Sequence, residues 1–269
     1  MIKIKSQEEI EIMREAGRIT RDTLKVVENS IRVGISTKEL DKIAFDYIKS
    51  QNAIPSFKNY SGYPASICAS VNDAIVHGIP SEDIILKEGD IISIDVGAKY
   101  KGFHGDAART FPVGKIDAKK KKLIKITEQS FFEGIKGLKS GAFVGDISHR
   151  IQTFVEKNGF SIVRELVGHG IGKELHEDPQ VPNYGRSGSG PRLNANSVIA
   201  IEPMVNMGER YVVFMPDGWT CKTRDGMPSA HYENTVLITE EGIEILTLWG
   251  LPYYDKVFEC RSCCYGYSW

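Results

Sequence analysis

The sequence predicts an α+β fold made of two related halves. Predicted helices are followed by predicted strands, and this order occurs twice along the chain. The segments Leu86–Asp95 and Leu193–Glu202 are alike, because each starts with Leu, continues with an Ile/Val-rich strand pattern and ends with an acid. No Gly/Ser/Pro-rich linker divides the halves. Helices grouped before strands are typical of helices that cover one face of a mainly antiparallel sheet.

The first half, roughly residues 1–115, begins with two predicted helices. Ser6–Glu9 and Ser36–Glu39 each have the Ser-x-x-Glu pattern of a capping box, and apolar residues follow both at helical spacing. Ile91–Val96 is apolar and β-branched, which predicts a buried strand. The glycines that follow this strand predict turns.

The second half, roughly residues 116–248, repeats this order. Apolar residues at helical spacing predict helices over Lys119–Lys136 and around Ile147–Val155. The predicted strands are Ser161–Leu166, Val198–Val205, Thr235–Thr239 and Glu244–Leu248. Gly185–Pro191 is predicted to be a surface loop. The two halves together form one predicted domain over residues 1–248.

The composition favours a reduced, cytoplasmic protein over a membrane, secreted or nucleic-acid-binding one. The chain has 269 residues and a formal net charge of −1, so its bulk charge provides no attraction for nucleic acid. No apolar run reaches the length of about 18 residues that would span a membrane, and the N-terminus lacks the apolar region of a signal peptide. The 5 cysteines are too few for a disulfide framework.

Residues 249–269 form a predicted C-terminal extension that contains Cys260, Cys263 and Cys264. Cys260 and Cys263 have the spacing of half a zinc site, but the sequence offers no second half. The extension is also rich in aromatic residues, and a free apolar tail promotes aggregation. We therefore expect it to pack on the outside of the domain and to take no part in catalysis.

Asp95 and Asp106 flank a glycine-containing turn and predict a pair of facing acids. If a hairpin is centred between Tyr100 and Lys101, the two carboxylates lie directly opposite each other, roughly 5 Å apart at Cβ. Like charges at that distance destabilise a sheet. The alternative is that both are exposed acids near a loop, although Asp95 ends an apolar strand, where an exposed acid is less expected.

The second half contains a matching pair of acids, Glu202 and Glu233. Glu202 ends the second of the two related segments, and the pattern of His104–Asp106 recurs in His231–Glu233. Acids buried together repel each other unless something neutralises them. Four carboxylates in one cleft therefore predict one or two divalent cations, because oxygen-rich sites suit such metals.

Histidine supplies further candidate ligands and catalytic groups, namely His169, His77 and His176. His169 lies between glycines in Val167–Gly172, where close backbone approach leaves an imidazole open. Each of these histidines could instead be structural, with its ring nitrogens satisfied by hydrogen bonds. The sequence has no His-Glu-x-x-His, no Gly-x-Ser-x-Gly and no P-loop, so it gives no indication of those chemistries.

Several segments resemble the motifs of the type I methionine aminopeptidases. They are Gly62–Pro80, Ile94–Gly97, Gly102–Asp106, Gly168–Gly172, Ile201–Met204 and Tyr232–Thr235. The resemblance covers essentially residues 1–248. The chain is similar to the short bacterial form, because it lacks both the zinc-finger extension of many eukaryotic relatives and the large insertion of the type II enzymes. The likeness implies the pita-bread fold, in which two pseudo-symmetric halves surround a central metal site.

The resemblance implies two divalent metal ions per chain, drawn from Mn, Fe, Co or Zn. By this likeness Asp95 chelates one metal and His169 binds the other. Asp106 and Glu233 bridge both metals, and Glu202 completes the second site. Glu202 is also the implied catalytic proton shuttle.

The resemblance further assigns substrate contacts. His77 and His176 are implied catalytic residues that bind the substrate and the developing oxyanion. The implied methionine pocket consists of Tyr60, Tyr63, Cys68 and Trp219, since soft and aromatic groups suit a thioether. An ordinary core cluster is the alternative for these residues. Leu175 stands where the family has an aromatic residue, and a monovalent cation is implied at Asn72, Ala74 and Ser229.

These observations predict a metal-dependent aminopeptidase that removes the initiator methionine from new polypeptides and prefers a small second residue. The enzymatic alternative is a proline-specific peptidase of the same fold, which usually carries an extra N-terminal domain. The other alternative is a non-catalytic binding module of this fold, but such modules typically lose metal ligands. We expect a monomer, as is usual in the family.

A run of lysines, Lys119–Lys122, lies at the start of a predicted helix, where positive charge is unfavourable to the helix dipole. One interpretation is a solvated helix start. The other is a basic patch for transient contact with ribosomal RNA, because the expected substrate is a nascent chain.

Overall fold

The computed structural model describes residues 1–248, and the predicted C-terminal extension with its cysteines lies outside them. The helices are α1 (Gln7–Glu28), α2 (Thr37–Ser50), the short 3-10 helix η1 (Tyr60–Gly62), α3 (Ala118–Gly134) and α4 (Val144–Lys157). Within the described residues, none of these helices combines the length and apolarity needed to cross a membrane.

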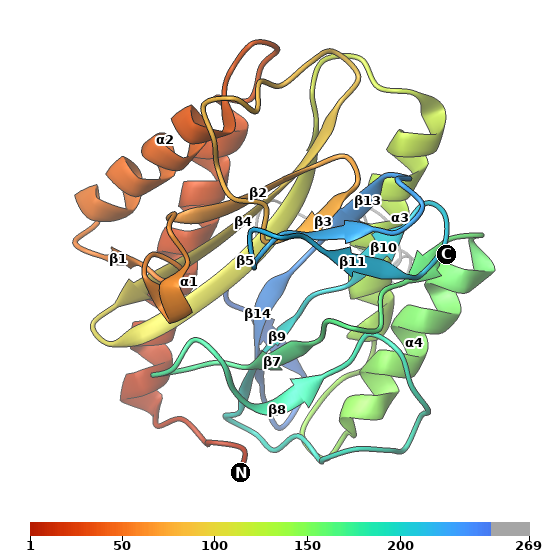
Figure 1. Cartoon of the computed structure of the whole chain (residues 1–269). Coiled ribbons are helices and arrows are strands. Elements are labelled where there is room, and N and C mark those ends of the chain that lie inside the picture. The colour runs from red at the N-terminus through yellow and green to blue at the C-terminus, as the bar shows by residue number, and fades with distance from the viewer. Residues whose placement is uncertain (249–269) are drawn as a thin grey trace, which may run out of the picture.

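The strands belong to both halves of the described chain (Figure 1). They are β1 (Ile54–Pro55), β2 (Ile67–Val71), β3 (Ala74–Val76), β4 (Ile91–Tyr100), β5 (Phe103–Pro112), β6 (Ser161–Ile162), β7 (Gly168–Gly170), β8 (Glu177–Val181), β9 (Val198–Ile201), β10 (Met204–Asn206), β11 (Val212–Phe214), β12 (Cys221–Thr223), β13 (Ser229–His231), β14 (Asn234–Ile238) and β15 (Ile243–Ile245).

The strands pair antiparallel, as predicted, but they divide into four sheets instead of one. The first contains β1, β2, β4 and β5, and the largest has the order β15-β14-β9-β7-β8. The other two are β13-β10-β6 and β11-β12-β3. A proline explains one break: Pro203 separates β9 from β10, so the predicted strand Val198–Val205 is interrupted beside Glu202.

The helix starts follow from local sequence. Ser6 caps α1 and Ser36 caps α2, and in both helices the capping box predicted from the sequence is formed. Helix α3 begins one residue before its predicted start, because the side chain of Asp117 accepts a hydrogen bond from the backbone N–H of Lys120. In Figure 1, α1 and α2 lie near the β4–β5 hairpin, and α3 and α4 lie side by side.

The β4–β5 hairpin has a different register from the one predicted. Tyr100 pairs with Phe103, so the turn consists of Lys101 and Gly102. Both turn residues have positive φ, 44° and 90°, which is the geometry of a tight two-residue hairpin turn and is easy for glycine. Asp106 therefore faces Gly97, two residues from Asp95, and the two acids are diagonal neighbours instead of direct partners.

The described residues form four apolar clusters, of which three are large and the fourth is a small group around Ile75, Met204 and Cys221. One cluster joins α1 and α2 to β2, β4 and β5, and another joins α3 and α4 to β9, β10 and β14. The third brings Met13 and Phe103 together with Ile171 and Leu246. We propose that the boundary between the two halves of the domain lies near residue 115.

Helix α1 approaches the strands closely through glycine. A Cβ atom added at Gly17 would lie 2.5 Å from the backbone oxygen of Leu246, and one added at Gly105 of β5 would lie 2.9 Å from the backbone of α1. Any larger side chain at Gly17 would therefore push α1 away from its neighbours. The N-terminal helix is thus held against both β5 and the last described segment of the chain.

We predict that Gly17→Ala destabilises the protein, although alanine normally favours a helix by about 1 kcal/mol. The added methyl group has no room, and overpacking typically costs about 1–3 kcal/mol. The melting temperature measured by calorimetry should fall by about 2–10 °C. Gly242→Ala is the control, because a Cβ there meets nothing within 4 Å. A Gly17→Ala protein as stable as the control would contradict this account of the packing.

Candidate metal centre

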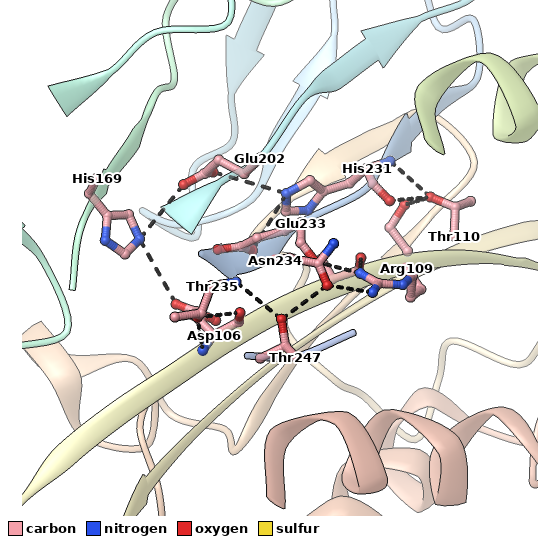
Figure 2. A network of polar contacts seen from close by, with 12 residues as sticks. Asp106, Arg109, Thr110, His169, Glu202, His231, Glu233, Asn234, Thr235 and Thr247 are labelled. Carbon is pink, nitrogen blue, oxygen red and sulfur yellow. Dashed lines mark hydrogen bonds and ion pairs between the residues drawn. The ribbon is translucent and has the colours of Figure 1, made fainter. Parts of the chain in front are cut away.

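Acidic side chains from four places in the chain line one buried cleft, and Figure 2 shows three of them, Asp106, Glu202 and Glu233. Asp95 lies on β4 and Asp106 on β5 of the same hairpin. Glu202 follows β9, and Glu233 lies between β13 and β14. Only 4% of Asp106 and 2% of Glu233 is exposed. The structure thus brings together the four acids that the sequence analysis singled out.

Backbone hydrogen bonds fix Asp106 and Glu233 next to each other. The Thr235 hydroxyl accepts a hydrogen bond from the N–H of Asp106 and donates one to its carbonyl oxygen, both at 2.9 Å. The N–H of Glu233 donates to the carbonyl oxygen of Ala108 at 2.9 Å, and the N–H of Ala108 donates back at 3.4 Å. The positions of these acids are therefore set by the fold.

The acids are in an environment that opposes their charge. Burial raises the pKa of Asp95 to about 7. Burial, and next repulsion from the neighbouring acids, raises the pKa values of Asp106 and Glu233 well above the ordinary range. The pKa of Glu202 is also raised, first by burial and then by the charge of Asp95. The charge of Arg109 opposes the rise in the pKa of Glu233, although the hydrogen bond from its guanidinium goes to the backbone oxygen of Glu233.

Several oxygen atoms in this cleft have no partner within the described residues. They are Oδ1 of Asp95, Oδ1 of Asp106 and Oε1 of Glu233. A buried carboxylate oxygen without a hydrogen bond is costly. Carboxylate oxygen atoms of this kind are suitable ligands for divalent cations. The residues present therefore fit a metal centre.

His169 adds an imidazole to the acids. Its Nδ1 lies 2.9 Å from the carbonyl oxygen of Gly170, to which the neutral ring donates. Its Nε2 then carries a lone pair and lies 3.9 Å from Oδ2 of Asp106 and 3.7 Å from Oε1 of Glu202. Burial is the first cause that lowers the pKa of His169, to about 3, so the ring is neutral and able to bind a metal.

The glycines around His169 allow the backbone to approach other strands. A Cβ at Gly168 would lie 2.4 Å from the carbonyl oxygen of Ala200, and one at Gly170 would lie 2.0 Å from that of Asp178. The pairing of β7 with β8 also shifts register between His169 and Gly170, and such irregularities redirect side chains. The glycine pattern in the sequence thus has the close-approach role that was predicted.

Ligand-type atoms form two groups that share Glu233. One consists of Asp106, His169 and Glu233, and the other consists of Asp95, His231 and Glu233. The atoms within each group lie within 4.8 Å of one another. The sequence analysis gave His231 no role at the site. Its position two residues before Glu233, on the same side of an extended segment, was the available signal.

A cavity of about 140 Å³ opens beside the acids. Its lining includes all the residues predicted to contact substrate: Tyr60, Tyr63, Cys68, His77, His176 and Trp219. Phe57 and Leu175 complete its apolar wall. A cavity of roughly 150 Å³ holds a benzene molecule, so this one has room for a single apolar side chain of moderate size.

The apolar end of the cavity is rigidly packed. The rings of Tyr63 and Trp219 meet edge to face with centroids 5.1 Å apart. The Tyr63 hydroxyl lies 3.1 and 3.0 Å from the carbonyl oxygens of Ile67 and Gly78. Burial raises the pKa of the Cys68 thiol well above its ordinary value, so Cys68 is a neutral sulfur in the wall.

Two histidines, His77 and His176, line this cavity together with the acids. His77 has a positive φ of 58°, which is a strained backbone conformation for a non-glycine residue. His176 lies with its ring centroid 4.2 Å from that of His169, and its Nδ1 is 2.7 Å from the hydroxyl of Tyr60. Burial lowers the pKa of both His77 and His176.

The residues implied for a monovalent cation are partly brought together. The N–H of Ser229 donates to the carbonyl oxygen of Asn72 at 2.9 Å, and Asn72 has a positive φ of 52°. Ala74 begins β3 two residues later. A cation at this place stays a prediction.

Comparison with known proteins gives consistent results. A model of metallopeptidase family M24 matches residues 11–240. Methionine aminopeptidase 1 of Bacillus subtilis is 56% identical over 247 residues, which are 92% of this chain and 99% of that protein. The crystal structure of methionine aminopeptidase from Thermotoga maritima has a TM-score of 0.91 at 46% identity, covering 93% of this chain and 100% of the other.

A more distant solved structure shares the architecture but is longer. The prolidase from Pyrococcus furiosus has a TM-score of 0.73 at 25% identity. The match covers 92% of this chain but 66% of the prolidase.

We predict that divalent metal stabilises the protein and that the effect grows with pH. The pKa of Asp95 is raised from 3.8 to about 7. In metal-free protein the protonated form of Asp95 therefore contributes stability at low pH, and this contribution is lost as the pH rises through about 7. Bound cations reverse this loss. Metal at about 100 times its dissociation constant should add about 2.7 kcal/mol, or about 5–10 °C in melting temperature.

The measurement is thermal unfolding of metal-free protein with and without Mn²⁺ or Co²⁺ at about pH 5.5 and about pH 8, on either side of the raised pKa. Mg²⁺ serves as a comparison, because it binds imidazole poorly. A metal-induced increase in melting temperature that is equal or larger at the lower pH would contradict the assignment of the acids as ligands.

Proposed function

The chain belongs to the type I methionine aminopeptidases of metallopeptidase family M24, and from that premise we propose how its residues carry out the reaction. It has the pita-bread fold, depends on divalent metal and removes the N-terminal methionine from polypeptides. The proline-specific and non-catalytic alternatives are not favoured, because the likeness to methionine aminopeptidases extends over nearly the full length of both chains. The proposal rests on one observation above all: the buried acids lie beside a cavity that is large enough for one side chain.

We assign the metal ligands residue by residue. Asp95 would hold one cation and His169 the other, with Asp106 and Glu233 placed between them and Glu202 at the His169 position. The donor set of carboxylates and imidazole suits Mn, Fe, Co or Zn. When bound in such a site, divalent cations polarise the substrate carbonyl and make a water molecule more acidic.

Glu202 is placed to move protons. It differs from Asp106 and Glu233 in being more exposed, with 14% of its side chain accessible in the cavity. Its Oε1 lies 3.7 Å from Nε2 of His169, and its side chain lines the cavity. We propose that its carboxylate accepts a proton from the attacking water and delivers it to the leaving amine.

His176 and His77 would bind the substrate backbone. When Tyr60 donates its hydroxyl hydrogen to Nδ1 of His176, the other ring nitrogen carries a hydrogen. That N–H is available to a peptide carbonyl oxygen, and a donor at this place favours the negative charge that develops there. His77 is the second donor, and its strained backbone is fixed by the strands around it.

The cavity explains the choice of methionine. Its aromatic rings and the neutral Cys68 sulfur match a flexible thioether side chain. The acids at one end would attract the positively charged α-amino group, so that only a chain end fits. We propose that limited room beyond the cavity also favours a small second residue.

We further propose that the enzyme acts as a monomer in the cytoplasm, where the N-termini of new chains first appear. Transient ribosome contact through Lys119, Lys120, Lys121 and Lys122 would suit this substrate. Lys119 and Lys121 are exposed on α3. Lys120 and Lys122 donate hydrogen bonds to the backbone oxygens of Gly89 and Asn158, so their charges are held near the helix start.

The central prediction concerns the acids between the two metal positions. Asp106→Asn and Glu233→Gln keep side-chain volume but remove the charge that both metals share. Each variant should lower turnover of a Met-Ala peptide by at least about 1000-fold, roughly 4 kcal/mol in the barrier, and should lose bound metal. Mass spectrometry of metal content and peptide hydrolysis are the measurements.

Glu128→Gln is the matched control, because Glu128 is a largely buried acid outside the cleft. An Ala-Pro peptide should be a poor substrate for every form of the enzyme. Full activity and metal content in either variant would refute the ligand assignment, and faster cleavage of the Ala-Pro peptide would refute the methionine assignment.

A separate prediction concerns ribosome contact. Changing Lys119, Lys120, Lys121 and Lys122 to Gln should weaken co-sedimentation with ribosomes and reduce its dependence on salt, because fewer phosphates are contacted. Hydrolysis of small peptides should be unchanged. The control variant changes the exposed lysines Lys38, Lys42, Lys49 and Lys58 to Gln. Equal co-sedimentation of the two variants at all salt concentrations would count against this contact.

A further inference from the structure

The imidazole of His231 is an unexplained group in the metal centre. His231 ends β13, and only 2% of it is exposed. Its Nε2 is buried and has no hydrogen-bond partner among the described residues. This atom faces the acids, 3.7 Å from Oε2 of Glu233 and 4.0 Å from Oε2 of Glu202 (Figure 2).

These distances are informative because they are longer than a direct hydrogen bond. Hydrogen bonds between nitrogen and oxygen are about 2.7–3.2 Å long, so His231 is too far away to donate to either carboxylate. Two ligands of one metal ion, each at about 2.1 Å, can be up to about 4.2 Å apart. The distance to Glu233 falls in this interval. Asp95, His231 and Glu233 also offer ligand atoms that all lie within 4.8 Å of one another.

His169 provides an internal standard. Its Nε2 lies 3.7 Å from Glu202 and 3.9 Å from Asp106. His169 and His231 therefore lie at nearly the same distances from the acids, and Figure 2 shows the two rings on opposite sides of Glu202. The comparison supports the same kind of role for both rings.

The backbone keeps His231 in this position. Its N–H donates to the Thr110 hydroxyl at 2.8 Å, and that hydroxyl donates to the carbonyl oxygen of His231 at 3.0 Å. His231 also pairs with Met204 of β10. The backbone of His231 is thus fixed on both sides, by Thr110 of β5 and by Met204 of β10.

We propose that Nε2 of His231 is a metal ligand at the position held by Asp95 and Glu233. Each of the two metal positions then has one imidazole, His231 in one and His169 in the other, and Glu233 is common to both. This inference rests on the proposed metal centre. An imidazole at the Asp95 position selects for Mn, Fe, Co or Zn over Mg and Ca, which prefer oxygen ligands.

Calorimetric titration of metal-free protein with Co²⁺ tests the assignment. Wild type should show two binding events. In His231→Gln, one event should weaken by at least about 10-fold, the visible Co²⁺ spectrum should change, and the other event should stay within about 2-fold. His104→Gln is the matched control. His104 precedes Asp106 by two residues in the sequence, as His231 precedes Glu233, but Nδ1 of His104 is 2.8 Å from the Ser56 hydroxyl.

Identical affinities and spectra in wild type and a folded His231→Gln protein would overturn the role of His231 alone. A wild type that binds no metal would overturn the proposed centre as well. X-ray absorption of Co²⁺-loaded wild type needs no variant and covers the case in which His231→Gln does not fold. It should show as many imidazole ligands as metal ions, whereas one imidazole for every two ions would exclude His231.

Discussion

Repulsion between carboxylates that are buried together is the constraint on which this structure depends. Asp106 and Glu233 are almost inaccessible to solvent, and the pKa values of all four acids are raised. Such an arrangement is costly without a counter-charge. The fold nevertheless maintains it, through backbone hydrogen bonds that join β5 to the segment carrying Glu233. Cations bound at this cluster, as we propose, would recover the stability given up there, and metal binding would then be coupled to the stability of the site.

In our proposal, the location of the cluster between the halves also determines where substrate would bind. Strands from both halves deliver the acids, and the cavity is closed by residues as distant in sequence as Phe57 and Trp219. The rigid aromatic packing at one end and the acids at the other define a space for one side chain and one charged amine. If substrate binds here as proposed, selectivity for an N-terminal methionine would follow from geometry that exists before substrate arrives.

Much of this could be predicted from the sequence, because the signals were local. The capping boxes placed α1 and α2, and the acids at the ends of apolar strands indicated a metal site. The hairpin register was wrong because both Lys101 and Gly102 adopt positive φ, which a centre between Tyr100 and Lys101 did not anticipate. His231 was missed because its role depends on the acids it faces across strands. The cavity, built from distant segments, was recognised only through the family resemblance.

Anomalous diffraction from crystals grown with Mn²⁺ tests the account most directly, because it locates bound metal without reference to activity. The account predicts two strong peaks in the cleft, with Asp106 and Glu233 between them, Asp95 at one and His169 at the other. Peaks found only at the protein surface, or a saturated crystal with no peak among the buried acids, would contradict it.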